Sequence, residues 1–132
     1  MNNMNFGFEE LEVWKKPRQF KNEIRKLTKT FPLEEKFRLT DQLIRSSRSI
    51  NAVILEGHGR FTYPDQIHFC VISRGSLTET VNHLIDALDE DYITNEQLTD
   101  LKIKAKEIER LINGYLSYLR KKRDEEKKKP DL

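Results

Sequence analysis

Residues 94–119 read TNEQLTDLKIKAKEIERLINGYLSYL, and this stretch decides the fold class. Thr94 and Gln97 have the spacing of a capping box, in which each side chain accepts a hydrogen bond from the other residue's backbone N–H, so a helix is predicted to begin here. Apolar side chains then recur every three or four residues, at Leu98, Leu101, Ala105, Ile108, Leu111, Ile112, Tyr115 and Leu119. This period is typical of one face of a helix that packs against other helices.

Three earlier segments have the same period. The first is predicted over residues 14–30, with Pro17 accepted because the first helical turn needs no intrahelical N–H bonds. It ends at Phe31-Pro32, since the residue before a proline is pushed out of the helical region. The second is predicted over residues 33–55, with Phe37 in its apolar stripe. A third begins near Pro64-Asp65 and runs to Leu88.

Two glycine positions carry further predictions. Gly57-His58-Gly59 is expected to end the second helix, because a glycine just past a helix end can take the left-handed cap conformation. Gly75 lies in the middle of the third helix, where glycine is less favourable than alanine by about 1 kcal/mol. A close helix crossing is therefore expected at Gly75.

Four helices of similar length with short connections predict an all-α protein, an up-down-up-down antiparallel four-helix bundle. An N-terminal extension is expected over residues 1–13, the bundle over 14–120, and a charged, disordered tail over 121–132. The length of 132 residues suits a single domain. Cys70 is the one cysteine, which excludes an internal disulfide and favours the cytoplasm. No apolar run approaches the roughly 18 residues that span a bilayer, so no membrane association is expected.

Charge placement is more informative than net charge, which is only +2 from 24 basic and 22 acidic residues. In such a bundle the turn after the second helix lies at the same end as both termini. Basic residues gather at that end, whereas the turn before Thr94 is acidic. A basic end can bind phosphates through counterion release. The predicted nucleic-acid-binding residues are Arg48, Arg60, Arg120, Lys121, Lys122 and Arg123.

A polar stripe follows the second helix, where Gln42, Arg45, Ser49 and Glu56 share one face; Ser76 and Glu79 lie on the third helix. We interpret these residues as a structural network in which Arg45 pairs with Glu56 or Glu79. The sequence predicts no catalytic residues, no metal ligands and no cofactor. The single Asp65-x-x-His68 motif falls short of the paired motifs of a di-iron bundle. Cys70 lies among apolar residues and is expected in the core.

Short motifs in one order along the chain resemble the family of bacterial four-helix-bundle proteins encoded in intervening sequences of 23S ribosomal RNA genes. The motifs are Phe8-Glu9-Glu10-Leu11-Glu12-Val13-Trp14, Phe31-Pro32-Leu33-Glu34-Glu35, Gln42 with Arg45, Ser49-Ile50, Glu56-Gly57, Arg60, Arg74-Gly75-Ser76-Leu77, and Tyr92-Ile93. The accessory variability protein of diversity-generating retroelements is similar to the same family. The chain departs from the pattern at Val53, where an asparagine is usual, and at Leu55, where an alanine is usual.

The resemblance implies a homo-oligomer, commonly a ring of five, whose basic surface binds RNA or DNA and which has no catalytic activity. The functional prediction is therefore a non-enzymatic nucleic-acid-binding or ribonucleoprotein-binding bundle. The alternative is a protein–protein interaction module. Such a module would bind a reverse transcriptase or a ribosomal component, and the module itself would make no direct contact with nucleic acid.

Overall fold

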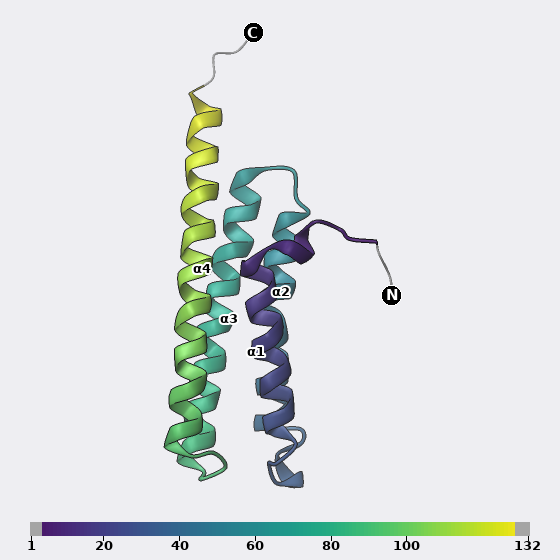
Figure 1. Ribbon diagram of the computed structural model, residues 1–132, viewed down its shortest axis with the longest axis vertical. Helices are drawn as coiled ribbons and strands as arrows, with labels where there is room; N and C mark the ends of the chain where they lie inside the picture. Colours follow the sequence, from purple (N-terminus) through teal and green to yellow (C-terminus); the bar gives the residue numbers. More distant parts are fainter. Residues whose placement is uncertain (1–3, 129–132) are drawn as a thin grey trace.

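The computed structural model describes residues 4–128, and within them all regular structure is helical. The long helices are α1 (Glu12–Thr28), α2 (Leu39–His58), α3 (Tyr63–Asp89) and α4 (Asn95–Lys127), and the 3₁₀ turns η1 (Phe8–Glu10) and η2 (Leu33–Glu35) precede α1 and α2. The four long helices lie side by side (Figure 1). The all-α prediction is confirmed.

The core lies between the four helices and is mostly aliphatic. Each helix packs against the next one in the chain, and α1 also contacts α4. The best-buried side chains, each at most 2 % exposed, include Phe20, Ile24, Leu43, Ile54, Leu84, Ile108, Ile112 and Leu119. Burying one such side chain contributes about 1.5–3 kcal/mol, so this row of residues holds the helices together.

The predicted capping box at the start of α4 is present. The Gln97 N–H donates to Thr94 Oγ1 at 3.1 Å, and the Thr94 N–H donates to Gln97 Oε1 at 2.8 Å. Helix α3 has a similar start, because the Asp65 N–H donates to the Thr62 hydroxyl at 3.3 Å. Both caps satisfy N–H groups that the first helical turn leaves without partners.

Helix α2 begins later than predicted. Residues 33–35 form η2, and Phe37 is 84 % exposed, so its placement in the apolar stripe was wrong. Glu35 explains the later start. Its carboxylate accepts from the Leu39 N–H at 3.1 Å and from the Tyr92 hydroxyl at 3.2 Å. The carboxylate thereby caps α2 and connects it to the turn between α3 and α4.

The stop predicted at Gly57-His58-Gly59 is confirmed, since α2 ends at His58, but the left-handed cap and the close crossing at Gly75 were wrong. Gly57 remains inside α2, and Gly59, the C-cap residue, has φ −78° rather than a left-handed value. A Cβ atom on Gly57 would lie 2.7 Å from Phe69 Cβ, so Gly57 allows α2 and α3 to approach closely. At Gly75 a Cβ atom would have no neighbour within 4 Å, so there is no close crossing at that position.

The ends of the bundle differ from the predicted boundaries. Helix α1 begins at Glu12, which places Pro17 in its second turn rather than its first. Pro17 is buried there, and it lacks the N–H that would bond the Val13 carbonyl. Helix α4 continues through residues 121–127, which were expected in a disordered tail; residues 129–132 lie outside the described part of the chain.

Candidate functional site

The predicted basic residues fall into two regions. The first, called the basic end here, consists of Arg60, Arg120, Lys121, Lys122 and Arg123, beside the α2–α3 connection and on the last turns of α4. This connection is at the top of Figure 1, and α4 extends beyond it. Much of this charge is compensated. Arg60 lies 3.2 Å from Glu56, Lys122 lies 3.6 Å from Glu125, and Arg123 lies 3.1 Å from Asp124.

Aromatic rings accompany the charges of the basic end. The Arg60 guanidinium lies 5.0 Å from the centre of the Phe69 ring, and the Lys122 ammonium lies 5.8 Å from that of Tyr118. Such cation–ring pairs are attractive because the face of an aromatic ring is electronegative. The sequence prediction named the cations of this region and not the rings.

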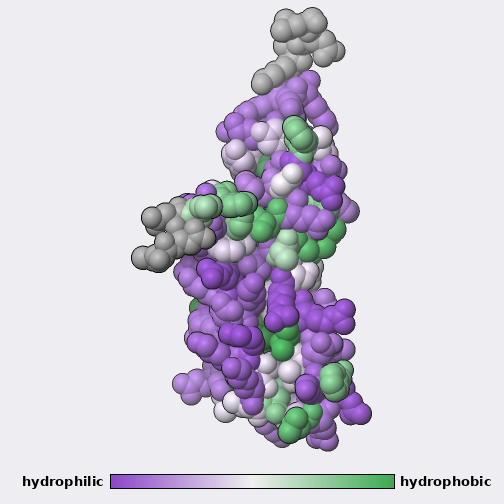
Figure 2. Space-filling model, turned by 90° about the vertical axis from the view of Figure 1, so that its right-hand side faces the viewer, coloured by the Kyte–Doolittle hydropathy of each residue, from purple (hydrophilic) through white to green (hydrophobic). Residues whose placement is uncertain are grey.

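Arg48 lies apart from the other predicted cations. It borders a cleft of about 190 Å³ between α1 and α2, which is lined by Lys21, Asn22, Arg25, Ile44, Ser47 and Arg48. This α1–α2 cleft was not predicted, because Lys21 and Arg25 were not among the candidates. Figure 2 shows the side of the molecule on which α1 and α2 lie, and most of its surface is hydrophilic.

The charge around the α1–α2 cleft is uncompensated. Arg18, Lys21, Arg25 and Arg48 form no ion pair with any carboxylate of residues 4–128. Burial lowers the pKa of Lys21 from 10.5, and the positive charges of Arg18 and Arg48 lower it further. A cleft of this kind can hold an anion, because the anion would supply the missing negative charge.

The spacing of residues on α1 builds one side of the cleft. Trp14, Arg18, Lys21 and Arg25 follow one another at intervals of four, three and four residues, so they form one stripe beside the buried face. The Arg18 guanidinium lies 5.4 Å from the centre of the Trp14 ring, which orients it at the end of the stripe. The sequence did carry a signal for this side of the cleft. It is a run of three cations at helical spacing with no acid between them on that face.

The predicted polar network forms only in part. Ser49 and Ser76 are joined by a hydrogen bond of 2.9 Å across α2 and α3. Arg45 pairs with Asp41 at 3.6 Å, and not with Glu56 or Glu79. Glu56 instead pairs with Arg60, and Glu79 lies 3.4 Å from His83. Gln42, Arg45, Ser49 and Glu79 line an open groove on the surface.

Buried hydroxyl groups lie between α2 and α3. Thr80 Oγ1 lies 2.9 Å from Ser46 Oγ and 2.8 Å from the Ser76 carbonyl oxygen. The Ser73 hydroxyl donates to the Ile50 carbonyl. These small side chains satisfy one another and the backbone, so their role is structural.

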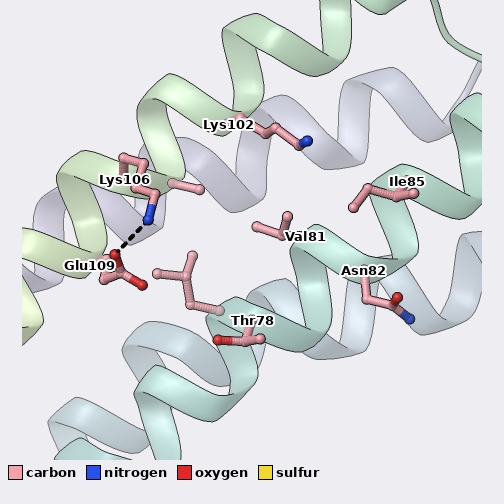
Figure 3. Close-up of a pocket in the computed structure, with 9 residues that line it drawn as sticks. Thr78, Val81, Asn82, Ile85, Lys102, Lys106 and Glu109 are labelled. Atoms are coloured by element: carbon pink, nitrogen blue, oxygen red, sulfur yellow. Dashed lines mark hydrogen bonds and ion pairs between the residues drawn. The ribbon is translucent and has the colours of Figure 1, made fainter.

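A second hollow, of about 450 Å³, lies between α3 and α4 (Figure 3). Leu77, Val81, Ile85 and Ala105 make it largely apolar, and an ion pair of 3.1 Å between Lys106 and Glu109 lies at its edge. A groove of this character suits an apolar partner surface better than a phosphate.

The described residues offer little for metal or thiol chemistry. Among residues 4–128, no three His, Cys, Asp or Glu side chains are grouped so that they could hold a metal ion. Cys70 is buried, as predicted, and burial raises the pKa of its thiol to about 11. None of the helices in this part of the chain is long and apolar enough to cross a membrane.

Solved structures and a family model both match the chain. A crystal structure from Bacteroides thetaiotaomicron, described as a protein of unknown function from the S23 ribosomal protein family, is 29% identical; it superposes with a TM-score of 0.73 over 80% of this chain and 95% of that one. No curated protein matches the chain. The family model named 23S rRNA-intervening sequence protein matches residues 9–114. This match covers most of the chain and confirms the resemblance stated from the sequence, so the chain belongs to the 23S rRNA-intervening sequence protein family.

Proposed function

We propose that this protein binds nucleic acid through its phosphate backbone and that the α1–α2 cleft makes the main electrostatic contact. The observation that carries this proposal is the uncompensated charge of Arg18, Lys21, Arg25 and Arg48. Holding like charges close together is unfavourable in the free protein. A bound phosphate relieves that repulsion, and it also releases counterions from the nucleic acid.

We also infer that the helices run alternately up and down, which the alternating ends of their connections in Figure 1 support. The working unit in this proposal is a cytoplasmic homo-oligomer, a ring of five as the family resemblance implies. Each copy would add one cleft, so several phosphates along a strand could be bound at once. Catalysis is not part of the proposed function.

The test is a salt titration of RNA binding, followed by fluorescence anisotropy of a labelled oligonucleotide. Arg48→Glu is expected to lower the affinity about tenfold and to reduce the slope of log K against log salt by about 0.9 for a lost phosphate contact. Arg110→Glu is the matched control, because it makes the same change at an exposed arginine on α4 that pairs with no carboxylate in the described part of the chain. Equal losses in the two variants would contradict the cleft, and absence of binding by the unaltered protein would contradict the proposed function.

The apolar α3–α4 hollow favours a second candidate function, which is docking of a protein partner. The partner would present an apolar helix face, as a reverse transcriptase or a ribosomal component could. Ile85→Glu would place a charge in the hollow and should abolish capture of such a partner. Capture that survives nuclease treatment of the sample, and that Arg48→Glu leaves unchanged, would favour docking over nucleic-acid binding.

A further inference from the structure

Two aromatic side chains at the basic end are left open to solvent. Phe61, in the α2–α3 connection, is 104% exposed, and Tyr118, on α4, is 51% exposed. Most rings of this size are buried in a folded protein, because an exposed ring forgoes the gain from leaving water. Each has a basic neighbour, since Arg60 precedes Phe61 in the chain and the Lys122 ammonium lies 5.8 Å from the centre of the Tyr118 ring.

Contacts between helices hold the exposed Tyr118 ring in place. Tyr118 stacks on Tyr115, with ring centres 6.4 Å apart and planes inclined by 11°. The Tyr115 hydroxyl lies 3.4 Å from His58 Nδ1, at the end of α2. The outer ring is thus flanked by a second ring, which itself contacts another helix. A supported planar surface loses little conformational freedom when another ring stacks on it.

We propose that Phe61 and Tyr118 form a stacking platform for unpaired bases, so that the protein prefers single-stranded nucleic acid to a duplex. This inference rests on the proposed function and names the substrate class for it. Bases in a duplex are stacked on one another and present only their edges, whereas an unpaired base can turn outward and stack on an aromatic ring. Lys121, which has no ion pair with described carboxylates, lies three residues after Tyr118 on the same face of α4, where it can contact the adjoining phosphate.

One strand would have to run from the cleft to the end of α2 to reach both sites. Arg48 and His58 are ten residues apart on α2, which corresponds to roughly 15 Å along a helix. A few nucleotides of an extended strand span such a distance. Phosphates would then contact the cleft while bases further along the strand stack at the basic end.

The test compares a labelled single-stranded RNA with the same RNA in a duplex, using the full chain. Phe61→Ala and Tyr118→Ala are each expected to weaken single-strand binding about tenfold and to leave duplex binding and the salt slope unchanged. Tyr118→Phe keeps the ring and should bind as the unaltered protein does. Phe37→Ala is the matched control, because Phe37 is 84% exposed, lies 5.3 Å from the Lys36 ammonium, and precedes α2 at the end away from the basic end.

The outcomes separate this inference from the proposed function. If the unaltered protein binds single strand and duplex equally and the two alanine variants bind as it does, the platform is wrong while phosphate binding stands. If Tyr118→Phe loses as much as Tyr118→Ala, stacking is wrong. If the unaltered protein binds neither RNA, the proposed function itself has failed.

Discussion

The α1–α2 cleft and the basic end are both rich in arginine and lysine, yet their charges are in different states. Around the cleft, four cations lie without a carboxylate partner among residues 4–128. At the basic end, Arg60, Lys122 and Arg123 each lie within 3.6 Å of an acidic side chain. An exposed ion pair contributes at most about 1 kcal/mol to stability, but it does cancel the local field.

The comparison shows that a count of basic residues along the chain does not locate the positive potential. Residues 120–123 form the densest basic run, and acidic residues 124–126 follow it directly on the same helix. Arg48 is outside any basic run in the sequence, with only Arg45 nearby, but the fold places Lys21 and Arg25 across the cleft from it. The field therefore depends on which residues face each other, and we expect the two regions to respond differently to mutation.

The largest expected effect comes from reversing charge in the cleft. Arg25→Glu with Arg48→Glu is expected to weaken RNA binding about 100-fold, because it removes two phosphate contacts and adds two repulsive charges. Arg120→Glu with Lys121→Glu, which makes the same change in charge at the basic end, is expected to cost about tenfold or less. Anisotropy at fixed salt measures both, and the opposite order would overturn the assignment of the main contact.

The sequence was sufficient for features that depend on neighbours in the chain. The Thr94–Gln97 cap and the apolar stripe of α4 involve residues three or four positions apart, and both were predicted. The cleft was not, because Lys21 and Arg48 meet only through the packing of α1 on α2. For the same reason the packing role of Gly57 was not predicted, because it depends on the approach of Phe69, a tertiary contact. Phe37 was misplaced because an apolar period does not reveal that Glu35 delays the start of α2.

Alanine substitutions at Gly57 and Gly75 compare a crowded position between α2 and α3 with an open position on α3. Gly57→Ala would force a Cβ atom to within 2.7 Å of Phe69 Cβ, so it should destabilise the protein by about 1–3 kcal/mol. Gly75→Ala has open space and should stabilise the helix by about 0.5–1 kcal/mol. Urea unfolding measures both changes. A neutral result at Gly57 would mean that α2 and α3 can separate there at little cost.

Removing acids at the basic end should make it more like the cleft. Asp124→Asn and Glu125→Gln each remove the partner of a cation at nearly constant size. Each is expected to strengthen RNA binding about twofold to threefold, since the freed cation can contact a phosphate. Glu109→Gln releases Lys106 on another face and is the control. A gain as large in the control would attribute the effect to net charge alone.

Replacing Lys21 is expected to give the smallest effect. The replacement should raise the stability of the fold and lower the affinity for RNA. Because the pKa of Lys21 is lowered, its positive charge is disfavoured in the folded protein at neutral pH. This penalty disappears as the pH rises through the lowered pKa towards the ordinary value of 10.5. Lys21→Met removes the penalty and should stabilise the fold by up to about 0.5 kcal/mol at pH 7. The same change should weaken RNA binding, because one cleft cation is lost.

In the unaltered protein a bound phosphate favours the charged form of Lys21, so RNA binding should take up protons on the alkaline side. Calorimetry in two buffers of different ionisation enthalpy can measure this uptake. A Lys21→Met variant that is both less stable and equally tight in binding would show that Lys21 is a packing residue and that the cleft does not hold the phosphate.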